Sequence, residues 1–433
     1  MTPSARLQAV LDLLTEIDTV PRPADALASG YFRARRYIGS KDRAAVSTVV
    51  YAVLRHRMRL SWWVERTVGG ESTMVLPPLR GRITPRRLLI AWLVLAEKRK
   101  PSTVDELFDG KKFSPEPLSD DERMLVKMLE THTVMHPEMP DVVQVECPEW
   151  AAPLLKARFG TDFMREMEAL LKQAPLDLRV NPLKATREGI LAELKKAGYK
   201  AEPCRLSAFG IRLAERVSLA DLPMLKNGQV EIQDEGSQLV AQLVEAKPGM
   251  RVVDFCAGAG GKTLAIAAQM ENKGRIIACD VLEKRLKRST ERFRKAGFHN
   301  IEIRPLGSER DPWVKKHKGS FDRVLADAPC TGVGAWRRNP DARWRMLGPG
   351  LETLLKLQAE ILDSAARLVR PGGRFIYATC SLLPEENERQ VERFLEDHKE
   401  FRLVPYSSSE SYLSLTPARD GTDGFFGAVM ERV

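Results

Sequence analysis

The spacing of apolar residues changes along the chain, and each change predicts a different kind of secondary structure. Up to about residue 145, apolar residues recur every three to four positions, most clearly over residues 5–17, 42–64 and 86–98. This spacing predicts amphipathic helices. Asp42 is placed to cap the second helix, and Pro85 lies near the start of the third. We therefore expect an all-helical domain over residues 1–145.

Residues 146–247 alternate between short strand-like and helical patterns. Strand-like stretches cover residues 176–184, 203–215 and 229–234, and a helical stretch covers residues 187–198. This order predicts a small α+β module of the split β-α-β kind, similar to an RNA-recognition motif.

From residue 248 to 433, strands and helices alternate strictly. The expected strands are residues 250–255, 275–280, 300–305, 322–327 and 373–378. A long amphipathic helix over residues 351–369 is expected to stop at Pro371, and residues 401–406 and 424–433 to form a terminal antiparallel pair. The alternation predicts a doubly wound, Rossmann-like α/β sheet, so the whole chain is a multidomain protein.

Composition narrows the class of partner. The 433 residues carry a net charge of +10, which favours a polyanion such as RNA. Six cysteines without metal-site spacing predict free thiols and no metal. The longest apolar run, residues 88–96, is too short to cross a membrane. These features predict a cytoplasmic protein without membrane contact, and nothing in them suggests more than a monomer.

A glycine-rich turn follows the strand that ends at Asp254. Its spacing fits neither a P-loop, because Cys256 stands where glycine is needed, nor a dinucleotide fingerprint, because Thr263 replaces the third glycine. The turn is similar to that of class I S-adenosylmethionine enzymes. The expected cofactor-binding residues are Cys256, Ala257, Gly258, Ala259, Gly260, Gly261 and Lys262. Asp280 ends the next strand, where it either binds a ribose diol or only caps a helix.

Two cysteines, Cys330 and Cys380, each follow an expected strand. Ligands of open parallel sheets bind outside the carboxyl ends of the strands, so neighbouring strands would bring both thiols to one crevice. A thiolate that adds to carbon 6 of cytosine makes carbon 5 nucleophilic, and an acid must then protonate nitrogen 3. Asp327 is placed to be that acid if desolvation raises its pKa. Alternatively, each cysteine is a small buried hydrophobe, which is our interpretation of Cys256.

Arginines are interleaved with tryptophans over residues 336–345, shortly after Cys330. This composition suits phosphate contacts and base stacking on single-stranded RNA, and we favour RNA contact. The alternative is a loop whose tryptophans pack into the protein.

With these motifs in place, the chain strongly resembles the RsmB/NOP (Sun) family of RNA cytosine-5 methyltransferases. The resemblance rests on CAGAGGKT, DAPC, TCSLLPEENE, GVGAWRRNPDARWR and the closing DGFF, with RVNPLK and QDEGSQL ahead of them. The N-terminal helices look like the NusB-type RNA-binding domain of bacterial rRNA enzymes. The resemblance thus implies a NusB-like RNA-binding domain (1–145), an RRM-like pre-catalytic module (146–247) and an S-adenosylmethionine-dependent catalytic domain (248–433).

The resemblance also implies residue roles. Cys380 matches the family's nucleophile, and Cys330 the cysteine that helps to resolve the covalent adduct. Lys262 and Asp327 are implied to hold the cytosine, and Asp280 the cofactor. Ala259 departs from the family, which often has proline there. An adenine contact is expected within residues 306–311, around Gly307–Glu309.

We therefore predict an S-adenosylmethionine-dependent enzyme that forms 5-methylcytosine in RNA, most simply rRNA, either free or within a ribosomal subunit. One alternative is methylation of an exocyclic amine, although the chain has Asp-Ala-Pro-Cys instead of the tetrapeptide typical of those enzymes. The other is a non-catalytic RNA-binding factor for ribosome assembly.

Overall fold

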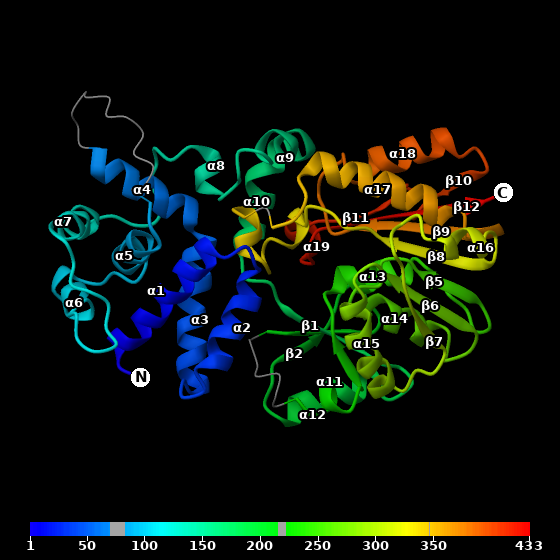
Figure 1. Ribbon diagram of the computed structural model, residues 1–433, viewed down its shortest axis with the longest axis horizontal. Helices are drawn as coiled ribbons and strands as arrows, with labels where there is room; N and C mark the ends of the chain where they lie inside the picture. The colour runs from blue at the N-terminus through cyan, green and yellow to red at the C-terminus, as the bar shows by residue number, and fades with distance from the viewer. Residues whose placement is uncertain (70–82, 215–221, 346) are drawn as a thin grey trace. The chain divides into compact units, whose positions relative to one another are not determined.

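The computed structural model describes residues 1–69, 83–214, 222–345 and 347–433 (Figure 1). By its internal contacts the chain forms two compact units. The helical unit comprises Met1–Lys156 together with Asn339–Gly348, and the larger unit comprises Ala157–Arg338 together with Pro349–Val433. The chain therefore returns to the helical unit for a short segment late in the sequence. The three predicted domain boundaries stay a prediction.

The helical unit is built around α5, whose residues from Leu88 to Leu95 are almost all buried. Its helices are α1 (Pro3–Thr19), α2 (Ala24–Ala34), α3 (Ser40–Arg55), α4 (Arg57–Gly69), α5 (Pro85–Leu95), α6 (Pro101–Leu107), α7 (Asp120–Leu129) and α8 (Asp141–Gln144), with α9 (Ala152–Phe159) at its edge and the short η4 (Pro340–Arg343). The all-helical character predicted for residues 1–145 is confirmed over the described part of that range.

Two details of the predicted helices are wrong. The helix expected over residues 42–64 is two helices, because the backbone leaves the helical conformation at His56, between α3 and α4. Asp42 does not cap α3, which begins after Gly39; its carboxylate instead binds Arg6 and the Met1 amino group. Pro85 does open α5, with Thr84 as the capping residue.

The larger unit contains a four-stranded antiparallel sheet in the order β2-β3-β1-β4. It consists of β1 (Leu176–Val180), α11 (Arg187–Lys196), β2 (Ala201–Pro203), β3 (Gly210–Leu213), α12 (Pro223–Lys226) and β4 (Val230–Ile232). This topology is the predicted split β-α-β arrangement. The strand-like stretch expected over residues 203–215 is divided between β2 and β3, and residue 215 lies outside the described residues.

The second sheet of the larger unit has eight strands, seven of them in the order β10-β12-β9-β8-β5-β6-β7, with β11 paired to β12. The strands are β5 (Arg251–Asp254), β6 (Arg275–Asp280), β7 (Ile301–Pro305), β8 (Phe321–Asp327), β9 (Val369–Thr379), β10 (Phe401–Val404), β11 (Leu413–Leu415) and β12 (Phe425–Arg432). Strands β7, β6, β5, β8 and β9 run parallel, whereas β10 and β12 form the predicted antiparallel pair.

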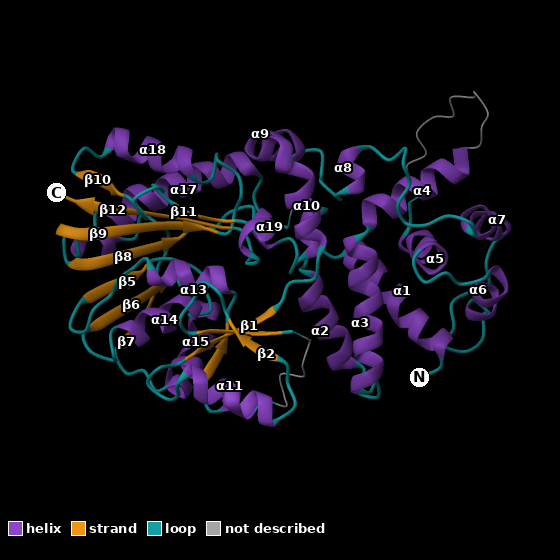
Figure 2. Ribbon diagram, turned by 180° about the vertical axis from the view of Figure 1, so that it is seen from behind, coloured by secondary structure: helices purple, strands orange, loops and turns teal. Residues whose placement is uncertain are grey.

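Helices cover both faces of this sheet, as a doubly wound fold requires (Figure 2). On one face lie α16 (Pro312–Lys316), α17 (Leu351–Ala366) and α18 (Glu388–Asp397), and on the other α13 (Glu235–Gln242), α14 (Gly261–Gln269) and α15 (Glu283–Ala296). The short η1 (Gly160–Asp162), α10 (Phe163–Leu171), η3 (Val333–Ala335) and α19 (Pro417–Asp420) complete the unit. The predicted fold class is confirmed.

The boundary between α17 and β9 differs from the prediction. The helix ends at Ala366, and β9 already begins at Val369, which pairs with Phe321 of β8. Gly372, with φ of +70°, allows the strand to pass through the Pro-Gly-Gly sequence with a shift of register. The turn residues therefore lie inside the strand instead of before it.

No helix in the described ranges is both long and apolar enough to cross a membrane.

Candidate active site

The two cysteines predicted to act together are in contact. They follow β8 and β9, which are parallel neighbours with Asp327 opposite Ala378. The sulfur atoms of Cys330 and Cys380 are 3.4 Å apart. Because both strands end at the same edge of the sheet, the prediction that the thiols share one crevice is supported directly by the geometry.

Both thiols line a cavity of about 730 Å³ that also contains the glycine turn. Of the predicted site residues, the cavity is lined by Cys256, Ala257, Gly258, Ala259, Gly261, Lys262, Asp280, Asp327, Cys330 and Cys380. Gly260 is the exception, because its φ of +78° turns the chain into α14 and its Cα faces Phe293 of α15. From the region 306–311, Leu306 and Glu309 line the cavity.

Lys262 and Asp327 form an ion pair within this cavity, with Lys262 Nζ 2.6 Å from Asp327 Oδ2. Burial lowers the pKa of Lys262, but Asp327, and less strongly Cys380, raise it by more, so the ammonium form is stabilised. The sequence suggested Asp327 as the acid at nitrogen 3, and the family resemblance implied that Lys262 and Asp327 both hold the cytosine. The direct ion pair between the two side chains was not predicted.

Asp280 organises the glycine turn. Its Oδ2 accepts a hydrogen bond from the Gly258 amide at 2.8 Å, and its Oδ1 accepts one from the Leu282 amide at 2.7 Å. The carboxylate therefore serves the turn before α15 and lines the cavity at the same time. The two interpretations offered by the sequence are compatible, since each oxygen keeps a further lone pair for a ligand.

Asp254 is a site residue that the sequence motif contained but that was not assigned a role. Its side chain is buried in the cavity wall; Oδ2 accepts a hydrogen bond from Thr263, whereas Oδ1 makes none with the described residues. Burial raises the pKa of Asp254 to about 7. A buried carboxylate oxygen without a partner is costly, and a cationic ligand in the cavity would satisfy it. The donor set therefore fits S-adenosylmethionine, which carries an ammonium group and a ribose diol.

Two thiols of the cavity, Cys330 and Cys256, have raised pKa values. The hydrogen bond with Cys380 and burial raise the pKa of Cys330 well above its ordinary value. The neutral thiol is therefore the favoured form of Cys330, whose sulfur lies 3.4 Å from that of Cys380. Burial likewise raises the pKa of Cys256, in agreement with its interpretation as a packing residue.

Glu386 and Asn387 hold the two cysteine loops together, a role that sequence reasoning missed. Glu386 is fully buried and accepts hydrogen bonds from Thr331 N at 2.8 Å, Thr331 Oγ1 at 2.5 Å and Gln358 Nε2 at 3.0 Å. Asn387 bonds Thr379 Oγ1 at 2.5 Å and the Ser381 carbonyl at 3.0 Å. The only signal in the sequence is the short distance from TCS to PEEN.

The RNA contact predicted for residues 336–345 is wrong for Trp336, Arg337 and Arg343, because these side chains are buried. In the larger unit, Trp336 is fully buried, and Arg337 and Arg338 bind the Asp234 and Asp423 carboxylates. These pairs join the QDEGSQL and DGFF motifs beside the cavity, where Asp234, Arg338 and Asp423 form part of the wall.

The second half of the same segment packs in the helical unit. Arg343 is 2% exposed and donates to the Glu146 carbonyl at 2.9 Å, and Trp344 Nε1 donates to the Leu54 carbonyl at 3.0 Å. Asp341 accepts a hydrogen bond from the Ala24 amide at 2.9 Å. The arginines and tryptophans of this segment are therefore packed within the protein and stabilise it, as the alternative interpretation held.

These features together define an S-adenosylmethionine-dependent methyltransferase of class I. They are the doubly wound sheet, the glycine turn, the acidic residue at the end of the second strand and a cavity suited to a cationic ligand. The family model described as 16S rRNA methyltransferase RsmB/F matches residues 241–431, and the ferredoxin-like domain of the same proteins matches residues 147–220. The chain belongs to the RsmB/F family of methyltransferases, and S-adenosylmethionine is its cofactor.

Relatives of established name extend over nearly the whole chain. The chain is 30% identical over 409 residues to the ribosomal RNA small subunit methyltransferase B of Pectobacterium atrosepticum, covering 91% of each chain. It is 30% identical over 422 residues to the protein of that name from Vibrio cholerae, covering 94% of this chain and 93% of the relative. The crystal structure of PH0851 superposes with a TM-score of 0.80 at 25% identity, covering 100% of this chain and 99% of the other. The family resemblance seen in the motifs is confirmed.

Proposed function

We propose that this protein methylates carbon 5 of a cytosine in 16S rRNA through a covalent enzyme–RNA adduct. The observation that carries the proposal is the 3.4 Å contact between the Cys330 and Cys380 sulfur atoms, in a cavity shared with the cofactor turn. Both 16S rRNA as substrate and the small-subunit activity come from the names of the family and the relatives. A single exocyclic-amine methyl transfer would have no use for two thiols.

In the proposed reaction, the Cys380 thiolate adds to carbon 6 of the cytosine, and nitrogen 3 takes a proton. The ion pair of Lys262 Nζ with Asp327 Oδ2, 2.6 Å apart, supplies that proton and holds the ring. S-adenosylmethionine supplies the methyl group, which becomes bonded to carbon 5. Water then takes the carbon 5 proton, the electron pair of the bond from Cys380 to carbon 6 returns to sulfur, and nitrogen 3 gives its proton back to the pair of Lys262 and Asp327, which releases 5-methylcytosine.

Cys330 assists this last stage. Its sulfur touches Cys380, so it lies next to the bond that must break. Because the hydrogen bond with Cys380 and burial raise its pKa, Cys330 holds a proton, which it gives to the Cys380 sulfur as the bond from that sulfur to carbon 6 breaks.

The cofactor would be held by the glycine turn, with Asp280 for the ribose and Asp254 for the ammonium group. The orphaned Oδ1 of Asp254 and the remaining lone pairs of Asp280 support this assignment. Lys262 lies at the border between the cofactor turn and the thiols, where it serves both ligands.

The remaining assignments belong to the same proposal. The helical residues 1–145 form a NusB-like RNA-binding domain, residues 146–247 a pre-catalytic module, and residues 248–433 the catalytic domain. The protein acts as a monomer in the cytoplasm, on rRNA or a ribosomal subunit. The six free cysteines among the described residues suit a reducing compartment.

The test is bisulfite mapping of 16S rRNA from cells in which the gene is deleted and then restored on a plasmid, either as the wild type or as Cys380→Ala. We expect one protected cytosine with the wild type and none with Cys380→Ala. Cys204→Ala is the matched control, because Cys204 is a buried thiol of the small sheet, outside the cavity, and should restore protection. Protection that persists with Cys380→Ala, or that is absent with the wild type, would refute the proposal.

A further inference from the structure

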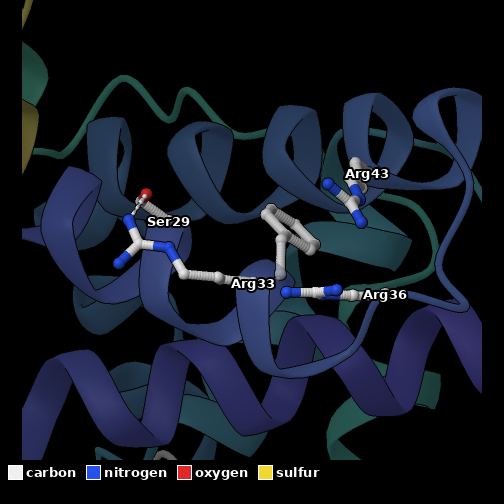
Figure 3. A pocket seen from close by; sticks show the side chains of 5 residues that line it. Ser29, Arg33, Arg36 and Arg43 are labelled. Atoms are coloured by element: carbon white, nitrogen blue, oxygen red, sulfur yellow. Dashed lines mark hydrogen bonds between the residues drawn. The ribbon is translucent and has the colours of Figure 1, made fainter.

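A second cavity, in the helical unit, is lined by arginines (Figure 3). It has a volume of about 440 Å³ and lies between the end of α2 and the start of α3. Its walls are formed by Ser29, Phe32, Arg33, Arg36 and Arg43. No part of the catalytic cavity contributes to it.

The charge of this cavity is not compensated by the protein. Within the described residues, neither Arg33, Arg36 nor Arg43 has a carboxylate at ion-pair distance: Arg33 bonds only the Ser29 hydroxyl at 3.4 Å, and Arg43 the Ile38 carbonyl at 2.7 Å. The one acidic residue of the segment, Asp42, is engaged by Arg6 and the Met1 amino group. Three guanidinium groups therefore face one cavity without a counter-ion from the chain.

Arg33 lies in the last turn of α2, where a cation stabilises the helix, but the placement of Arg43 does not serve helix stability. Arg43 lies in the first turn of α3, at the positive end of the helix dipole, where a cation is unfavourable. No side chain caps this helix at Gly39. An anion in the cavity would offset this unfavourable charge, since it is attracted by the guanidinium groups.

The surroundings indicate which anion. Five of the eleven residues 33–43 are arginine or lysine, and Tyr37 among them is 76% exposed. An RNA strand matches this surface, because its backbone phosphates bind arginine and its bases stack on an exposed tyrosine. We propose that the cavity of Arg33, Arg36 and Arg43 binds backbone phosphates of the RNA substrate, with Tyr37 stacking on an adjacent base. This inference rests on the proposed function for the choice of RNA as partner.

The salt dependence of RNA binding tests it. Full-length Arg33→Ala/Arg36→Ala is compared with the wild type in filter binding to transcribed 16S rRNA over a potassium chloride series. Each lost phosphate contact lowers the slope of log K against log salt by about 0.7–0.9, so the double variant should lose roughly 1.4–1.8 in slope and 25- to 60-fold in affinity at about 0.1 M salt. Both side chains are exposed, and an unchanged thermal midpoint verifies folding; Arg36→Gln is the fallback variant.

Lys112→Ala/Lys127→Ala is the matched control. It removes the same charge from exposed lysines near α6 and on α7, at the other end of the helical unit from α2 (Figures 1 and 2). We expect its slope to equal that of the wild type. Equal losses in the two double variants, or no loss in Arg33→Ala/Arg36→Ala, would overturn the assignment, as would competition by polyglutamate as strong as by RNA.

These outcomes are separate from those of the proposed function. If the wild type binds rRNA but methylates no cytosine, the catalytic proposal fails and the phosphate site stands. If the wild type methylates and the arginine variant binds rRNA as tightly as the wild type does, only the phosphate site fails.

Discussion

Replacing Gly260 by alanine should damage the cofactor turn in a way that the structure makes quantitative. Gly260 has φ of +78°, and a Cβ there would lie 2.4 Å from Phe293 Cε1 and 2.6 Å from Phe293 Cζ. Phe293, on the buried face of α15, is 4% exposed and packs in the core, so it has little room to move. The substitution therefore combines backbone strain with overpacking.

The two costs can be separated with a second glycine. A left-handed backbone costs a non-glycine residue about 1–2 kcal/mol, and overpacking adds roughly 1–3 kcal/mol. Gly198, at the end of α11, has φ of +84°, but a Cβ there would meet no atom within 4 Å, so Gly198→Ala incurs the backbone cost alone. At about 2–4 °C per kcal/mol for a domain of this size, Gly260→Ala should lower the melting temperature by roughly 4–20 °C, and Gly198→Ala by about 2–8 °C.

The assay is thermal unfolding with and without S-adenosylmethionine. Saturating cofactor at about 100 times its dissociation constant should stabilise the wild type and Gly198→Ala by about 2.7 kcal/mol, but Gly260→Ala much less. Equal melting temperatures for the two variants, or an undiminished cofactor shift in Gly260→Ala, would refute the reasoning about this turn.

Three further predictions concern Asp254 and Lys262 of the cavity wall and Glu386, which holds the loops of the two cysteines. Because burial raises the pKa of Asp254 to about 7, a cationic cofactor must displace a proton from this carboxyl group at lower pH. Calorimetry should show cofactor affinity falling by up to tenfold per pH unit below about pH 7, and no such dependence in Asp254→Asn. Lys262→Met removes the ammonium partner of Asp327 and should slow single-turnover methyl transfer by roughly 10²–10⁴-fold, whereas an unchanged rate would exclude Lys262 from proton transfer. Glu386→Gln turns an amide donor toward the donors that Glu386 binds, so the free energy of unfolding in denaturant should fall by about 1–3 kcal/mol. Adduct formation should slow while cofactor affinity is kept, and a loss of cofactor affinity alone would contradict this positioning role.

Much of the catalytic unit could be predicted from the sequence, because its strands and helices follow periodic patterns and its chemistry lies at strand ends. The contact between Cys330 and Cys380 followed from two strand ends and one topological rule. The ion pair of Lys262 with Asp327 did not, since residues 65 positions apart give no local signal of their distance.

The errors have a common physical origin. Residues 336–345 have the composition of an RNA-binding loop, but their arginines are buried with carboxylates and carbonyls that come from remote parts of the sequence. Composition describes what a side chain can bind, whereas tertiary structure decides what it does bind. The break at His56 and the actual partners of Asp42 were missed for the same reason, because helix ends depend on contacts outside the helix.

The central claim is that Cys380 forms the bond to cytosine and Cys330 helps to break it. Denaturing electrophoresis of the protein after incubation with S-adenosylmethionine and 16S rRNA tests this claim most directly. Cys330→Ala should yield a shifted band that resists denaturation, whereas Cys380→Ala and the double variant should yield none. A covalent complex formed by Cys380→Ala, or full turnover by Cys330→Ala without any trapped complex, would contradict the account.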